Sequence, residues 1–242
     1  MGISVRQPID QAALERYLAQ HVPVVVLPLT IGQFSFGQSN PTYLLTDSSG
    51  ARYVLRKKPP GKLLSKTAHR VEREHRIMHA LGAATAAQVP VPAMYCLCED
   101  EAVLGSAWYL MEYLDGRIFE DPTMPGVSPA ERTEMWRDAV RTLARLHAVD
   151  PAAVGLADFA RPGRFYERQL ATWTAICDAQ ARVVDVETGM AVGPLPHMDE
   201  LVRFFGDKAR QPPDAATLVH GDFKIDNLVF SKTEPRVIGI LE

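Results

Sequence analysis

An acidic turn between two apolar runs is the part of this sequence best suited to chemistry. The turn, HGDFKIDN (220–227), places the carboxylate of Asp222 five residues before the amide of Asn227, with Lys224 between them. Phosphoryl transfer uses such groups, since a carboxylate accepts the proton of the attacking hydroxyl and an amide oxygen holds Mg²⁺ on nucleotide phosphates. The pattern predicts Asp222 as the base, Asn227 as a metal ligand and Lys224 as a cation within reach of the γ-phosphate.

His220 opens the same turn, and we expect it to orient the loop through hydrogen bonds, not to carry a proton. The alternative interpretation of the whole segment is an ordinary polar β-turn. The amide of Asn227 and the apolar, strand-like runs on both sides argue against that alternative.

A second candidate element is the glycine turn FSFGQSNPTY (34–43). Small and polar residues at a strand-to-strand turn leave backbone N–H groups available to phosphate oxygens. Gly37, Ser39 and Asn40 are the candidate contacts. A plain hairpin is the alternative interpretation.

A third candidate is the basic strand YVLRKK (53–58). Side chains alternate along a strand, so Arg56 shares a face with every second residue and is placed to hold nucleotide phosphates. Glu74, in a helix expected to follow, is the first choice for its carboxylate partner, and Glu72 is the reserve. The alternative is a solvated basic edge strand with surface ion pairs.

The fourth candidate is the run WYLMEYLDG (108–116), an apolar strand that continues into an extended linker. Such a linker can offer backbone groups to the edge of an adenine. A buried strand followed by a turn is the alternative.

The elements that must position these groups divide the chain into a β-rich half, 1–113, and a mostly helical half, 114–242. Apolar periodicity, with Asp10 and Ser128 as helix caps, underlies this assignment. Helices are predicted at 10–20, 66–81, 128–147, 164–182 and 198–210, and strands at 24–31, 42–46, 52–57, 93–98, 107–113 and on both sides of the acidic turn. The predicted fold class is α+β.

Composition narrows the class of protein. The chain has 242 residues, 47% of them hydrophobic and 23% charged, with a net charge of −3, which is typical of a soluble globular protein and argues against a nucleic-acid binder. No apolar run is long enough to span a membrane. The three cysteines, an odd and sparse count, favour reduced thiols in the cytoplasm.

Taken together, the motifs resemble a known family. The chain is similar to the aminoglycoside phosphotransferase-type small-molecule kinases, relatives of the protein kinases, and especially to the kinase-like domains at the N-terminus of some acyl-CoA dehydrogenases. The resemblance covers nearly the whole chain. It rests on GQSNPTY (37–43), YVLRKKPPG (53–61), VERE (71–74), MEYLDG (111–116), Arg168-Gln169 with Trp173, and LVHGD (218–222).

The resemblance implies a bilobal protein-kinase-like fold with a nucleotide-binding β-sheet lobe (1–113) and a helical lobe that carries the catalytic loop (114–242). Arg56 would stand where many kinases have a phosphate-binding lysine. The backbone of Glu112 and Leu114 would meet adenine, and Met111 would line the back of that pocket.

The resemblance also implies ATP and Mg²⁺ as cofactors and a small-molecule hydroxyl as acceptor. A hydroxyacyl-CoA is the first expectation, with Trp173 and Arg168 as candidate acceptor contacts, although core packing explains Trp173 equally well. An acyl-CoA dehydrogenase domain is the expected partner. The alternative function is that of a nucleotide-binding pseudokinase or interaction module without catalysis.

Three positions depart from the family pattern. Arg56 replaces lysine, and Phe36 stands where relatives often have a glycine. The family has an aspartate, its second Mg²⁺ ligand, where this sequence ends at Glu242, so we expect a truncated C-terminal lobe and little or no kinase activity. Equal ATP turnover by this chain and by a version extended through that aspartate would contradict this expectation.

Overall fold

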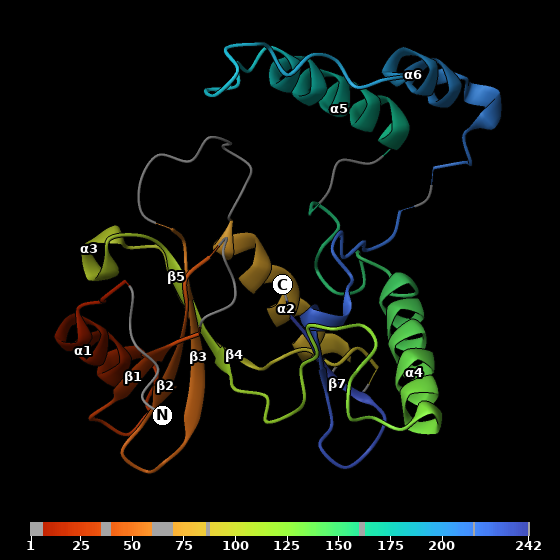
Figure 1. Cartoon of the computed structure of the whole chain (residues 1–242). Coiled ribbons are helices and arrows are strands. Elements are labelled where there is room, and N and C mark those ends of the chain that lie inside the picture. The colour runs from red at the N-terminus through yellow and green to blue at the C-terminus, as the bar shows by residue number, and fades with distance from the viewer. Residues whose placement is uncertain are drawn as a thin grey trace. The chain divides into compact units, whose positions relative to one another are not determined.

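A computed structural model describes residues 7–34, 40–59, 70–85, 88–159, 163–214 and 216–241 (Figure 1). Contacts between residues divide the chain into two compact units, Met1–Leu156 with Leu218–Glu242, and Ala157–Thr217. The sequence-based boundary at 113/114 falls inside the first unit and stays a prediction. Within the described residues, no helix combines the length and apolar character needed to cross a membrane.

A five-stranded antiparallel sheet dominates the N-terminal part of the first unit. The strand order is β1-β2-β3-β5-β4, with every neighbouring pair antiparallel. The strands are β1 (Thr30–Gln33), β2 (Thr42–Thr46), β3 (Arg52–Lys57), β4 (Met94–Cys98) and β5 (Trp108–Glu112). The α+β class and the strands at 42–46 and 52–57 are confirmed, and β4 and β5 lie within one residue of their predicted bounds.

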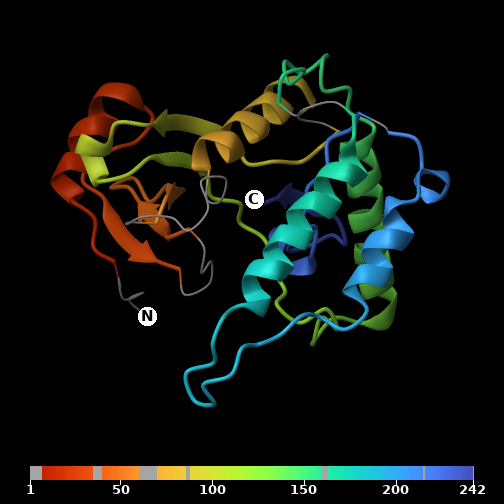
Figure 2. The same cartoon turned by 90° about the horizontal axis from the view of Figure 1, so that it is seen from above.

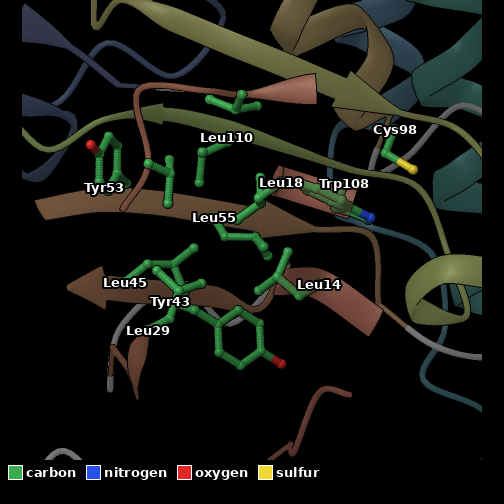
Figure 3. Packing of buried hydrophobic residues seen from close by; sticks show 12 residues of the cluster. Leu14, Leu18, Leu29, Tyr43, Leu45, Tyr53, Leu55, Cys98, Trp108 and Leu110 are labelled. Carbon is green, nitrogen blue, oxygen red and sulfur yellow. The ribbon is translucent and has the colours of Figure 1, made fainter. Parts of the chain in front are cut away.

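Helices cover both faces of this sheet, and each face of the sheet has its own hydrophobic core (Figure 1). Leu14 and Leu18 of α1 (Gln11–His21) pack with Leu55 and Leu110 of the central strands, as Figure 3 shows. On the other face, Val71 and Met78 of α2 (Val71–Thr85) pack with Val54, Tyr109 and Met111. The central strands β3 and β5 are therefore held between two apolar layers.

The remaining part of the first unit carries the acidic turn. It contains the long helix α4 (Pro129–His147), the turn η2 (Ile225–Asn227) and a hairpin of β6 (Leu228–Phe230) with β7 (Val237–Ile240). The short helix α3 (Glu101–Leu104), between β4 and β5, instead contacts α1. Ser128 caps α4 as predicted, since its hydroxyl accepts from the Glu131 amide. The Asp138 carboxylate on α4 accepts from the Val237 amide at 2.8 Å and so ties the hairpin to the helix.

The second unit contains two helices, visible with their connecting loop in Figure 2. They are α5 (Phe165–Ala181) and α6 (Met198–Gly206), followed by the turn η1 (Lys208–Arg210). The helix predicted at 198–210 is interrupted because Asp207 is extended and its carboxylate caps η1 through the Ala209 amide.

Two further predicted bounds are wrong, and the strand predicted on the N-terminal side of the acidic turn does not form, because residues 216–219 are irregular. The run 24–31 is a strand only from Thr30 onward, because Pro23 and Pro28 have no N–H for a ladder and the Val26 amide donates to Asp47 instead. The helix predicted at 66–81 begins at Val71 and continues to Thr85, since the alanines around Gly82 sustain it. Residues 66–69 lie outside the described part.

The linker after β5 is docked tightly on the β6–β7 hairpin. Arg117 and Phe230 exchange backbone hydrogen bonds of 2.7 and 2.8 Å. A Cβ atom at Gly116 would lie 2.4 Å from the Phe230 carbonyl oxygen, and one at Gly239 would lie 2.0 Å from Leu114 Cδ1. Glycine is therefore required at position 116, where the clash is with backbone, whereas a side chain at position 239 would meet the end of the Leu114 side chain.

We expect Gly116→Ala to destabilise the protein, because the new methyl group meets backbone atoms that cannot rotate away. Gly82→Ala is the matched control, since its Cβ atom would meet only Val91 Cγ2 at 3.5 Å, an ordinary contact, within a helix. That change is expected to stabilise α2 by up to about 1 kcal/mol. Thermal unfolding of the two variants tests whether Gly116→Ala lowers stability while Gly82→Ala raises it. A Gly116→Ala variant as stable as the wild type contradicts the account.

Asp47 holds the turn between β2 and β3. Its carboxylate accepts from the Ser49 hydroxyl at 2.6 Å and from the backbone amides of Ser49, Ala51 and Val26. These hydrogen bonds, the Ser49 hydroxyl first, lower the pKa of Asp47 to about 2 against the opposing effect of burial. The ionised carboxylate is therefore part of the folded sheet.

Asp47→Asn should lower the free energy of unfolding at neutral pH by about 1–3 kcal/mol, because amide donors lose a charged acceptor. The stabilising effect of the carboxylate is complete above its unfolded pKa of about 3.9 and is lost as the pH falls toward 2. The difference in melting temperature between the Asp47→Asn variant and the wild type should therefore become smaller as the pH is lowered from 6 to 2.5. Glu99→Gln, an exposed carboxylate, is the control, and a gap that does not depend on pH contradicts the assignment.

Candidate active site

The acidic turn is held together by Asn227. Its amide Nδ2 donates to the Asp222 carbonyl oxygen at 2.9 Å and to Asp222 Oδ2 at 3.2 Å. Asn227 is buried, whereas the Asp222 side chain is 64% exposed. Gly221 provides the φ of +88° that the chain needs immediately before Asp222. The result is a fixed loop that presents one carboxylate to the outside.

Lys224 lies between two carboxylates of the same turn. Its Nζ is 3.1 Å from Asp226 Oδ2 and 3.6 Å from Asp222 Oδ2. Asp226, and to a smaller extent Asp222, raise the pKa of Lys224, so this side chain stays cationic at neutral pH. The turn therefore combines an exposed carboxylate with an adjacent positive charge.

His220 orients the loop as the sequence predicted. The Asp222 amide donates to His220 Nδ1 at 3.3 Å, so the ring proton belongs on Nε2, which donates to the Leu241 carbonyl oxygen at 3.2 Å. The Leu241 amide in turn donates to the Asn227 carbonyl oxygen. The end of β7 and the acidic turn are thus joined on both sides.

A second cluster gathers on the α2 face of the sheet. Arg56 Nε donates to Glu74 Oε2 at 2.8 Å, and the Arg56 side chain is only 6% exposed. Of the two candidate partners, Glu74 is the one that pairs with Arg56. Tyr109 and Asn40 also donate to the Glu74 carboxylate, at 3.0 and 3.1 Å. Asn40, predicted to contact phosphates, is buried in the structure, and its amide donates to Glu74.

The end of β5, which leads into the linker, lies beside Ala93. The Glu112 amide donates to the Ala93 carbonyl oxygen, but the Ala93 amide donates to the Glu112 carboxylate at 3.0 Å and not to its carbonyl. Met111 is buried beside α2, and Leu114 packs against the β7 residue Gly239. Backbone groups of Glu112 and Leu114 thus lie between the sheet and the hairpin that carries the acidic turn.

The oxygen donors of the turn fit a magnesium ion. Because Asn227 Nδ2 is committed to Asp222, its Oδ1 is the end of the amide left for a cation. The described residues contain no cluster of three or more metal-ligating side chains. Mg²⁺ in nucleotide sites is usually held by one or two protein oxygens together with substrate phosphates, so a small donor set is sufficient.

Other predicted residues lie outside the described part of the chain or in the second unit. Gly37, Ser39 and Glu242 lie outside the described residues. Arg168 and Trp173 lie on α5 in the second unit.

Tyr109, which was not predicted from the sequence, belongs to the Glu74 cluster. The available signal was its position two residues before Met111, which puts both side chains on the same face of one strand. Its contact with Glu74 depends on where α2 packs, and local sequence does not specify that.

The family follows from comparison with known proteins. The pattern of the phosphotransferase enzyme family (APH) matches residues 30–241. The chain belongs to this family. A member of known structure, from Ralstonia eutropha and named as a candidate aminoglycoside phosphotransferase, is 39% identical with a TM-score of 0.79 over 97% of this chain and 64% of that one.

Two other similarities bear on function. The complex of APH(2")-IIa with streptomycin and ATP has a TM-score of 0.60 at 17% identity, over 98% of this chain and 71% of that one, which supports the fold alone. IBR3 of Arabidopsis thaliana, named as an acyl-CoA dehydrogenase by inference, is 44% identical over 96% of this chain. The chain spans 28% of the length of that relative. The predicted protein-kinase-like fold and the predicted family are confirmed.

Arg56→Ala is expected to lower the free energy of unfolding by at least about 1–3 kcal/mol, because the Glu74 carboxylate loses its cation in a poorly solvated place. Arg137→Ala is the control, since Arg137 forms an exposed ion pair with Glu134 on α4 and such pairs contribute about 0–1 kcal/mol. Denaturant titrations measure both, and equal losses would show that the Arg56 pair is an ordinary surface bridge.

Proposed function

We propose that this member of the phosphotransferase enzyme family transfers the γ-phosphoryl group of ATP to a hydroxyl of a small molecule. The main support for this proposal is the acidic turn, in which Asn227 fixes Asp222 while the Asp222 carboxylate stays exposed beside the Lys224 cation. Exposure suits a base that must reach an incoming hydroxyl, and the fixed backbone supplies its orientation.

In the proposed reaction, Asp222 accepts the proton of the acceptor hydroxyl as that oxygen forms a bond to the γ-phosphorus. The bond between the γ-phosphorus and the β,γ-bridging oxygen breaks, and ADP leaves with the bonding electrons. The product is a phosphate ester. Lys224, cationic at neutral pH, balances charge on the transferred group.

The nucleotide contacts are assigned to the first unit. Arg56, oriented by Glu74, holds phosphate oxygens, and the backbone of Glu112 and Leu114 receives adenine with Met111 behind it. Mg²⁺ would be held by Asn227 and would neutralise phosphate charge. The ATP in the complex of APH(2")-IIa supports the choice of nucleotide.

The acceptor class is proposed from the relatives. A chain that matches 28% of a protein named as an acyl-CoA dehydrogenase fits a domain that prepares or consumes a related acyl compound, so a hydroxyacyl-CoA is the proposed acceptor. An acyl-CoA dehydrogenase domain is the proposed partner. The three cysteines are free thiols, which suits the cytoplasm.

Asp222→Asn should reduce phosphoryl transfer by about 10²–10⁴-fold while MgATP binding remains, because only proton transfer is lost. Turnover is measured by ADP release. Asp226→Asn is the matched control, since Asp226 also pairs with Lys224 but is not the proposed base. This variant should lose far less turnover than Asp222→Asn. Equal losses would contradict the assignment of Asp222.

The acceptor is tested by incubating the protein with MgATP and separate panels of hydroxyacyl-CoA esters and aminoglycosides, with product masses as the readout. Phosphorylated hydroxyacyl-CoA supports the proposal, and phosphorylated aminoglycoside alone contradicts the acceptor class. MgATP binding with no turnover on any acceptor favours a pseudokinase.

A further inference from the structure

The Glu74 carboxylate collects hydrogen bonds from three segments that are distant in sequence. Arg56 on β3 and Tyr109 on β5 donate to the same oxygen, Oε2, at 2.8 and 3.0 Å. Asn40, just before β2, donates to Oε1 at 3.1 Å. Both carboxylate oxygens are therefore oriented from the sheet, although Glu74 itself belongs to the first turn of α2.

Tyr109 is the most deeply buried of the three donors. Its side chain is 0% exposed and packs with Val71 and Met78 of α2. The register of β3 and β5 places Tyr109 directly opposite Arg56. Opposite residues on neighbouring strands share a face with their Cβ atoms about 4.5–5.5 Å apart, so the phenol and the guanidinium approach the carboxylate side by side.

We propose that Tyr109 is a positioning residue for nucleotide phosphates, because its hydroxyl holds Glu74 in the orientation that aims Arg56. This inference rests on the proposed function, which assigns Arg56 to the phosphates. Tyr109 touches no nucleotide in this account and acts only through the carboxylate. A planar guanidinium binds phosphate in particular directions, so its aim matters more than that of the compact ammonium group of lysine.

An ordinary buried tyrosine also needs a partner for its hydroxyl. A purely structural Tyr109 would affect folding but would not distinguish ligands that carry phosphates from ligands that lack them. The positioning role makes that distinction, because Arg56 contacts phosphates whereas adenine is received by the linker.

The test compares dissociation constants of MgATP and adenosine, measured by isothermal titration calorimetry on the chain. Tyr109→Phe should weaken MgATP roughly tenfold, the loss expected when about one hydrogen bond to a charged group is removed, and leave adenosine unchanged. Tyr43→Phe is the matched control. Tyr43 is equally buried and donates to the Gln7 carbonyl oxygen at 2.9 Å, but it belongs to the core around α1. It should leave the affinity for both ligands unchanged.

A double-mutant cycle tests whether Tyr109 acts through Arg56. In an Arg56→Ala background, Tyr109→Phe should have no further effect on MgATP affinity, since the group that it positions is gone. Asn40→Ala is the second variant, in case Tyr109→Phe does not fold. It frees the other carboxylate oxygen and should also weaken MgATP selectively.

Three results would overturn the inference. They are an unchanged MgATP affinity in Tyr109→Phe, a parallel loss for MgATP and adenosine, and full additivity with Arg56→Ala. Failure of the unmodified chain to bind MgATP is a separate outcome, because it overturns the proposed function before any variant is compared.

Discussion

The contact between the linker and the β6–β7 hairpin is the constraint on which the candidate site depends. Gly116 approaches the Phe230 carbonyl oxygen so closely that no side chain fits, and Arg117 pairs with Phe230 through two backbone hydrogen bonds. This contact joins the strand that offers Glu112 to the hairpin that carries Asp222. Backbone geometry, and not the strength of any ion pair, therefore relates the segment proposed to receive adenine to the proposed catalytic turn, and a phosphoryl-transfer site would require such a rigid support.

Two clusters of charged and polar side chains lie on the framework that this contact fixes. At one end of the site, Glu74 gathers Arg56, Tyr109 and Asn40 on the protected α2 face of the sheet. At the other end, Asn227 fixes the backbone of Asp222 and leaves its carboxylate exposed next to Lys224. The first arrangement stabilises a cation where phosphates are expected, and the second keeps a base accessible. Substitution of arginine for the family lysine is compatible with this arrangement, because Arg56 still pairs with Glu74.

Features encoded by short segments were predictable from the sequence. Alternating apolar residues around the Asp47 turn specified strands 42–46 and 52–57, and Ser128 specified the start of α4. The acidic turn was recognisable because its chemistry lies within eight residues. The Arg56–Glu74 pair was also predicted, but other features that depend on tertiary contacts were not predictable. The hydroxyl of Tyr109 acquires its role only when α2 packs on the sheet, and the need for glycine at position 116 arises from Phe230, far away in the sequence. The apolar run 24–31 resembled a strand, but Pro28 within it has no N–H to donate to a ladder.

A crystal structure of the chain with Mg²⁺ and a non-hydrolysable ATP analogue tests the central claim most directly. The account predicts adenine against the backbone of Glu112 and Leu114, phosphate oxygens on the Arg56 guanidinium, Mg²⁺ on Asn227, and the γ-phosphate facing Asp222. An analogue bound elsewhere, or one whose phosphates leave Arg56 paired with Glu74 alone and lie away from the acidic turn, would contradict it.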